Sequence, residues 1–118
     1  MYTMMQVCRE LDMTYQTLKF YCNEGLVPNV KRDHNNRRVF DEKDVKWIKD
    51  LTCLKKCGMS IQEMKKHLEL CLQGEATIVS RKKMLARKQE ELRASIKELE
   101  DSISYIGWKQ NFYDEVLS

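Results

Sequence analysis

Apolar positions recur with helical spacing along most of the chain. Four short segments carry this spacing, and we predict helices over residues 4–11, 15–23, 42–56 and 61–72. A side chain able to cap the first backbone N–H groups precedes each of them: Thr3, Thr14, Asp41 and Ser60. Only a few residues separate the first two helices, so these two are predicted to form a helix-turn-helix.

Between the second and third helices the pattern becomes that of a β-hairpin. Residues 27–31 and 38–40 are predicted as strands, because they flank the turn-prone residues 33–36. The cations of this segment outnumber its single acid, Asp33, and they are Lys31, Arg32, Arg37 and Arg38. The net charge of the chain is only +3, so this local cluster, which we call the basic wing, is what indicates a nucleic-acid partner.

Beyond Thr77 the apolar residues follow a seven-residue repeat, which is the a/d spacing of a coiled coil. A rod of some 30 residues is about 45 Å long, too long to bury its stripe against a small head domain. We therefore expect a homodimer joined through this stripe, with Gly107 ending the helix and residues 108–117 forming a short helix that folds back. The predicted dimer interface consists of Ile78, Leu85, Leu92, Ile96, Leu99, Ile103 and Ile106.

The predicted fold is therefore mainly α. A winged helix-turn-helix head with a small β-hairpin wing is expected over residues 1–73, and a long C-terminal coiled-coil dimerisation helix with a short tail over residues 74–118. The 118 residues are 42% hydrophobic and 33% charged, which suits a helix-rich globular protein. No Gly-rich phosphate loop and no Ser/His/Asp set occurs, so we expect neither an enzyme nor a cofactor.

The cysteines and the lengths of the apolar segments indicate the compartment in which the protein is expected to lie. No segment approaches the roughly 18 uninterrupted apolar residues of a membrane span, and the N-terminus lacks a signal-peptide pattern. The cysteines are odd in number and lack the spacing of a disulfide framework: Cys8, Cys22, Cys53, Cys57 and Cys71. We expect reduced thiols in a cytoplasmic protein that does not bind membranes, each by default a small buried apolar side chain.

A helix-turn-helix places the N-terminal side chains of its second helix against base edges in the major groove of double-stranded DNA. The candidate base readers are Thr14, Tyr15, Gln16 and Thr17, with Gln16 foremost because an amide pairs with an adenine edge. Lys19 and Tyr21 are expected to hold phosphate. Arg37 and Arg38 are expected to grip the flanking backbone or minor groove.

Two strings of residues resemble the MerR family of bacterial regulators. "YTMMQVCRELDMTYQTLKFYCNEGLVP" is similar to the opening of that family, and "NRRVFDEKDV" to its wing. The chain departs from the family pattern at four positions, namely Lys19, Phe20, Cys22 and Arg37. The resemblance implies an antiparallel dimer that distorts an overlong promoter spacer so that RNA polymerase can engage, with Lys55 touching DNA near the operator centre.

The string "DVKWIKDLTCLKKCGMSIQEMKKHLEL", followed by "GEATIVSRKKML", is similar to a branch of that family. That branch responds to aldehydes and other small reactive electrophiles through one cysteine, which falls on Cys53. The resemblance implies that Cys53 is a sensor thiol, and Cys57, one helical turn on, is the candidate resolving thiol. The alternative is that Cys53 is an inert cysteine of the core.

The sequence leaves two alternative functions to consider, a metal sensor and a protein adaptor. The pairs His67/Cys71 and Cys53/Cys57 can each share a helical face, but metal sites need three or four convergent ligands. Family metal sensors hold their ligands around residues 74–85 and after residue 107, where this chain has no Cys or His, so no metal is expected. The second alternative is a coiled-coil adaptor without DNA binding. It is disfavoured by the intact cations and tyrosine of the predicted DNA surface, which are Lys19, Tyr21, Arg37 and Arg38.

Overall fold

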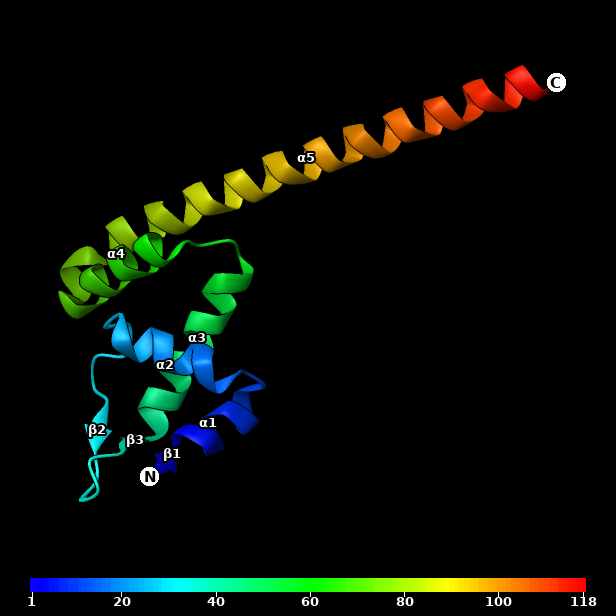
Figure 1. The fold of residues 1–118 in the computed structure, drawn as a ribbon. Coiled ribbons are helices and arrows are strands. Elements are labelled where there is room, and N and C mark those ends of the chain that lie inside the picture. The colour runs from blue at the N-terminus through cyan, green and yellow to red at the C-terminus, as the bar shows by residue number, and fades with distance from the viewer. The chain divides into compact units, whose positions relative to one another are not determined.

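The computed structural model describes all of residues 1–118, and it confirms a mainly α fold with a winged helix-turn-helix and a long C-terminal helix (Figure 1). Residues Met1–Arg81 form one compact unit, and Lys82–Ser118 form the second. The elements are β1 (Tyr2–Thr3), α1 (Met4–Leu11), α2 (Tyr15–Asn23), β2 (Lys31–Arg32), β3 (Arg38–Phe40), α3 (Glu42–Lys56), α4 (Ile61–Leu72), the 3-10 turn η1 (Gly74–Thr77) and α5 (Ile78–Leu117).

Side-chain caps set the starts of the four short helices, as predicted. In α1 the Thr3 hydroxyl accepts from the Gln6 backbone N–H while the Gln6 side chain accepts from the Thr3 N–H, which makes a capping box. Ser60 begins α4 in the same way, and Thr14 caps α2 through the N–H of Thr17. Asp41, predicted as a simple cap, begins α3 with a capping box in which the Asp44 side chain accepts from the Asp41 N–H.

The small sheet differs in part from the prediction. It has three antiparallel strands in the order β1-β3-β2, with Tyr2 opposite Phe40 and Lys31 opposite Val39. The first strand of the hairpin is Lys31–Arg32 alone, so the expected strand over residues 27–31 was wrong for residues 27–30. Strand β1 was not predicted, because two residues next to a helix cap are too few to show an alternating pattern.

A single hydrophobic core holds the head together. The largest fully buried side chains come from the four short helices, from β3 and from the loops after α2 and α3: Val7, Leu18, Leu26, Phe40, Ile48, Leu51, Met59 and Met64. Half-buried Trp47 closes one side of this core and donates its Nε1–H to the carbonyl of Leu26 at 2.7 Å. This bond ties α3 to the segment that follows the recognition helix α2.

Helix α5 is continuous from Ile78 to Leu117, so the predicted break at Gly107 was wrong (Figure 1). One glycine costs a helix only about 1 kcal/mol, which a helix of 40 residues tolerates. Ring contacts also bridge this region, because Trp108 lies 6.0 Å from Tyr105 and 5.9 Å from Phe112 between ring centroids. The tail is therefore part of α5 and does not fold back as a separate helix.

The first turn of α5 is fastened to the end of α4 within the head unit. The Thr77 hydroxyl donates to the carbonyl of Leu70 and lies 2.9 Å from that of Gly74, while Arg81 Nη2 donates to the Gly74 carbonyl at 2.8 Å. These contacts explain why the compact head extends to Arg81, beyond the boundary expected between residues 73 and 74. None of the helices combines the length and the apolar composition that a membrane span requires.

Candidate nucleic-acid interface

The first turn of α2 presents the predicted base readers at the surface. All four are exposed, but they differ in what their polar atoms do. The Thr14 hydroxyl accepts from the Thr17 N–H at 3.1 Å and donates to the Thr17 hydroxyl at 2.8 Å, so these two threonines are partly engaged with each other. Tyr15 and Gln16 have no such side-chain bond, which leaves them as the principal candidates for reading bases.

The wing is ordered by its one acid. Asp33 Oδ1 accepts from the backbone N–H groups of Asn35 and Arg37, both at 2.9 Å, which fixes the turn between β2 and β3. Asn36 takes a left-handed conformation with φ of 61°, and its carbonyl accepts from Arg32 Nη1 at 3.0 Å. The turn therefore has a definite shape, and it holds Arg37 in an exposed position.

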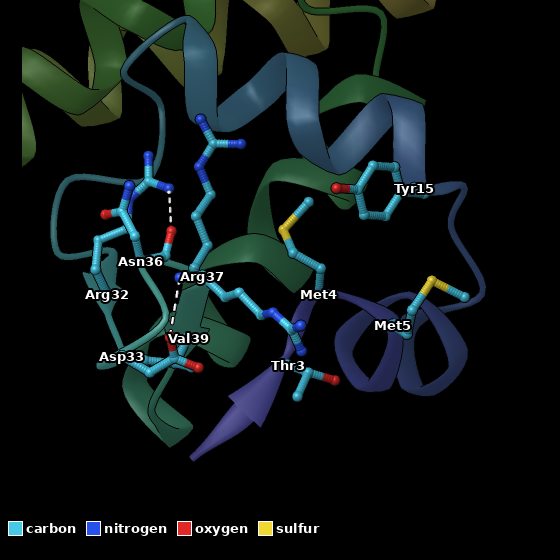
Figure 2. A pocket seen from close by; sticks show the side chains of 10 residues that line it. Thr3, Met4, Met5, Tyr15, Arg32, Asp33, Asn36, Arg37 and Val39 are labelled. Carbon is cyan, nitrogen blue, oxygen red and sulfur yellow. Dashed lines mark hydrogen bonds between the residues drawn. The ribbon is translucent and has the colours of Figure 1, made fainter.

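A hollow of about 510 Å³ lies between the recognition helix and the wing. In Figure 2, Tyr15 stands on the α2 side of this hollow, while Arg32 and Asn36 stand on the wing side. Three arginines line it from the basic wing, and the other lining residues are Thr3, Met4, Met5, Tyr15, Asp33, Asn36 and Val39. The structure thus brings the start of α2 and the wing cations to one concave surface that attracts a polyanion.

Arg38 is anchored by a residue that the sequence analysis did not single out. Its Nη2 donates to Asn23 Oδ1 at 2.7 Å, so the last residue of α2 holds an arginine of β3. This contact links the recognition helix to the wing across 15 positions of sequence. No pattern of spacing reveals such a pair, because it depends on how the hairpin returns to the helix.

Lys31 is not available to DNA as the basic wing suggested. Its Nζ lies 3.0 Å from Asp41 Oδ2 and 3.1 Å from Asp44 Oδ2, the two residues that begin α3. The hydrogen bond to Asp41, followed by that to Asp44, raises the pKa of Lys31. Donation from the Asp44 backbone N–H, followed by that from Lys31, lowers the pKa of Asp41. Lys31 therefore stabilises the fold, whereas the hydrogen bonds of Arg32 and Arg38 go to neutral acceptors and leave their charge available to DNA.

The two predicted phosphate contacts on α2 differ in exposure. Lys19 is exposed, but Tyr21 is only 4% exposed and belongs to the core, where burial raises the pKa of its hydroxyl. A phosphate contact by Tyr21 stays a prediction that rests on the hydroxyl alone. Lys55 is exposed in the last turn of α3, and its contact with DNA likewise stays a prediction.

The cysteines do not share one environment. Cys8 is buried, Cys22 and Cys71 are half-buried, and Cys53 and Cys57 are exposed near the end of α3. The expectation that each is a buried apolar side chain was wrong for these last two, and so was the alternative of Cys53 as a core residue. Burial raises the pKa of Cys8 and of Cys22, so these two thiols are poor nucleophiles.

The predicted seam residues of α5 lie uncovered on the single chain. None of the 40 residues of this helix is buried. The seven residues of the predicted interface are between 40% and 72% exposed, with Leu92 the least and Ile103 the most. An apolar stripe of this length is unusual on a monomeric surface.

Two family models match the chain. The model described as "MerR HTH family regulatory protein" matches residues 2–71, and "MerR, DNA binding" matches residues 45–106. An HTH-type transcriptional regulator of Haemophilus influenzae is 33% identical over 114 residues, covering 97% of this chain and 84% of that protein. The HTH-type transcriptional regulator AdhR of Bacillus subtilis is 36% identical over 87 residues, covering 74% of this chain and 62% of that protein.

Solved structures agree with the sequence matches. The crystal structure of HiNmlR, a MerR family regulator lacking the sensor domain and bound to promoter DNA, is 33% identical with a TM-score of 0.78, covering 97% of this chain and 90% of that one. A MerR family structure from Listeria monocytogenes, 24% identical with a TM-score of 0.82 and covering 97% and 86%, shows the same fold. These relatives are transcriptional regulators and not enzymes, as expected for this chain. With a helix-turn-helix, a basic wing and a family match over residues 2–71, the chain belongs to the MerR family of DNA-binding transcriptional regulators.

Proposed function

We propose that the chain works as a homodimer that binds a two-fold symmetric promoter element in double-stranded DNA. The observation that carries this proposal is the concave surface between the first turn of α2 and the wing arginines. Tyr15 and Gln16 read base edges from the major groove, while Arg37 and Arg38 hold the flanking backbone. The relative HiNmlR, which matches along almost the whole chain, is bound to promoter DNA in its crystal structure.

The dimer forms through α5. The uncovered seam supports this, since the seven-residue spacing continues along an unbroken helix that buries none of its own residues. The family resemblance implies that the two helices run antiparallel. A two-fold axis through the pair then presents two recognition helices to two half-sites of opposite orientation, as symmetric operators require.

Binding distorts the operator. Bending or untwisting a promoter costs several kcal/mol, which the contacts of two recognition helices and two wings offset. In the MerR family such distortion realigns an overlong promoter spacer for RNA polymerase, and we assign the same task to this chain. It acts in the cytoplasm, where bacterial promoters are found.

Modification of Cys53 by an electrophile or an oxidant switches the regulator. Its thiol is exposed one turn before Cys57 and close in sequence to Lys55. A change at this end of α3 can alter how the head holds DNA without releasing it. Metal sensing is not proposed, since no group of three or more possible ligands converges in the structure.

The test pairs a chemical and a functional measurement. After brief exposure to an aldehyde, mass spectrometry of the DNA-bound protein should find an adduct on Cys53, and a promoter reporter should respond. Cys53→Ser should bind the promoter normally but lose the response, while Cys8→Ser, a change at a buried thiol, should keep it. A Cys53→Ser protein that responds fully would remove Cys53 as the switch and leave the proposed DNA binding intact.

A further inference from the structure

A second thiol site lies outside the DNA-binding surface, at the junction of α4 and α5. Cys71 in the last turn of α4 has its Sγ 3.7 Å from Nδ1 and 3.9 Å from Nε2 of His67, one helical turn earlier. Arg81 Nη1 donates to the same sulfur at 3.8 Å. A thiol, an imidazole and a guanidinium therefore meet at one point.

The guanidinium is held in place by other bonds. Arg81 Nη2 donates to the Gly74 carbonyl at 2.8 Å, and its Nε donates to the Thr77 hydroxyl at 3.2 Å. Thr77 is only 7% exposed. The positive charge beside Sγ is thus fixed by the fold, whereas an arginine on an open helix face moves freely.

His67 is suited to remove a proton from the thiol. Burial lowers the pKa of His67, the positive charge of Arg81 lowers it further, and Asp50 on α3 opposes them. The imidazole is therefore neutral at pH 7 and can accept a proton. A nucleophile, a neighbouring base and a fixed charge make the arrangement by which proteins activate cysteine.

The sulfur also lines a small hollow. Cys71 borders a space of about 190 Å³ together with the apolar side chains of Pro28, Trp47 and Leu72, the cation Lys43, and the polar residues Asn29 and Asp44, of which Asp44 is paired with Lys31. Drug-sized ligands need pockets of about 300–1,000 Å³, so this space takes only a molecule of a few heavy atoms. Its apolar walls favour a neutral molecule, and Lys43 favours one that carries a carbonyl oxygen.

We propose that Cys71 is a reactive thiol that adds to small, uncharged α,β-unsaturated carbonyl compounds. The thiol proton passes to a ring nitrogen of His67 while Sγ forms a bond to the β-carbon of the compound. The carbon–carbon π bond breaks and its electrons form an enolate, which takes the proton back from His67 at the α-carbon. The product is a thioether, and the step needs no oxidant or further reactant.

The addition has a structural consequence in the head unit. Arg81 lies at the start of α5, and its contact with Sγ is one of the bonds that fasten this helix to α4. An adduct occupies the sulfur and disturbs that contact. This site is independent of Cys53, because the two thiols lie on different helices, α4 and α3.

The experiment measures the rate of addition at each cysteine. The full-length protein is treated with methyl vinyl ketone at pH 7, and peptide mass spectrometry follows each thiol with time. Although half-buried, Cys71 should react at least about tenfold faster than exposed Cys57. His67→Gln should slow Cys71 about tenfold, while His34→Gln, in the exposed wing turn, should leave it unchanged.

The pH profile separates activation from mere structural support. In the wild type the rate of addition at Cys71 should fall as the pH is lowered and His67 becomes protonated. The His67→Gln protein should show no such fall. Arg81 and Asp50 are the charged groups that face the imidazole. Cys53→Ser should not change the rate at Cys71, so failure of the proposed switch leaves this result unaffected. A Cys71 that reacts no faster than Cys57, or a rate untouched by His67→Gln, would overturn the assignment.

Discussion

At the scale of single residues, the proposed DNA surface has two kinds of side chain: those expected to read base edges and those expected to hold phosphate. Gln16 is exposed in the first turn of α2 and has no side-chain hydrogen bond, whereas Arg38 of the wing is held by Asn23 at the end of α2. Base-edge contacts discriminate between sequences, but phosphate contacts act on all sequences alike. Replacing a base-reading residue should therefore change sequence preference, whereas replacing a phosphate-holding residue should weaken binding to all sequences.

Gln16→Ala should relax the preference at one base pair of each half-site by about 1–3 kcal/mol. Arg38→Ala should instead weaken binding to every sequence and lower the salt slope by about one unit per subunit. Titrations against base-substituted operators at several salt concentrations distinguish them. An equal loss of affinity for all sequences in the Gln16→Ala protein would exclude Gln16 as a residue that reads a base.

Asp44, in the first turn of α3, should contribute strongly to the stability of the head. It is 4% exposed, and its Oδ2 accepts from the Asp41 N–H at 2.9 Å and from Lys31. Asp44→Ala removes this acceptor, so the free energy of unfolding should fall by about 1–3 kcal/mol in urea titrations. Lys46→Ala on the same helix, at an exposed position, should change it little.

The ion pairs of Lys31 should make the stability of the head depend on pH in a defined direction. The pKa of Asp41 is lowered from 3.8, so its contribution is complete above pH 3.8 and is lost as the pH falls through the lower value. The pKa of Lys31 is raised from 10.5, so its contribution is lost only above pH 10.5. Lys31→Gln should destabilise the protein at pH 7, and this loss should shrink as the pH falls below 3.8 and through the lowered pKa of Asp41. A loss that does not change as the pH falls would contradict this origin.

At the scale of elements, the sequence predicted the short helices well because their ends are marked by local chemistry. Thr3, Thr14, Asp41 and Ser60 each cap the helix that was predicted to follow them. Local signals failed where the deciding contact is distant in sequence. Neither β1 nor the pairing of Lys31 with Asp44 can be predicted without knowing that β3 lies between two partners and leads into α3.

The candidate site shows the same division. The exposed position of Tyr15, Gln16 and Arg37 follows from the helical phase and the turn, and the sequence sufficed to select them. The roles of Asn23 and Arg81 depend on tertiary contacts over 15 and 10 positions, so the sequence did not indicate them. Gly107 misled the prediction because a lone glycine is weak evidence for a helix end.

Gly107→Ala tests the continuity of α5. A Cβ at this position meets nothing within 4 Å, and the backbone there is helical. The substitution should raise the free energy of unfolding by up to about 1 kcal/mol per subunit. Gly25→Ala is the matched contrast, because φ of 75° at Gly25 makes an added side chain destabilising. Destabilisation by Gly107→Ala would favour a break in the helix.

At the scale of the whole molecule, the proposed function depends on two copies acting together. Replacing both Leu92 and Leu99 with Asp places charge in the predicted seam and should yield monomers in sedimentation experiments at micromolar concentration. Glu91→Asp, beside the seam, should leave the dimer intact. A wild-type protein that sediments as a monomer would contradict the dimer directly.

The central claim, a dimer that reads a symmetric operator, is tested most directly by selecting sites from random double-stranded DNA with the full-length protein. A dimer of this kind should enrich an inverted repeat whose two half-sites are related by a two-fold axis. The wild type and Gln16→Ala should differ in the same base pair of each half-site. Enrichment of a single asymmetric half-site, or of no sequence, would contradict the account.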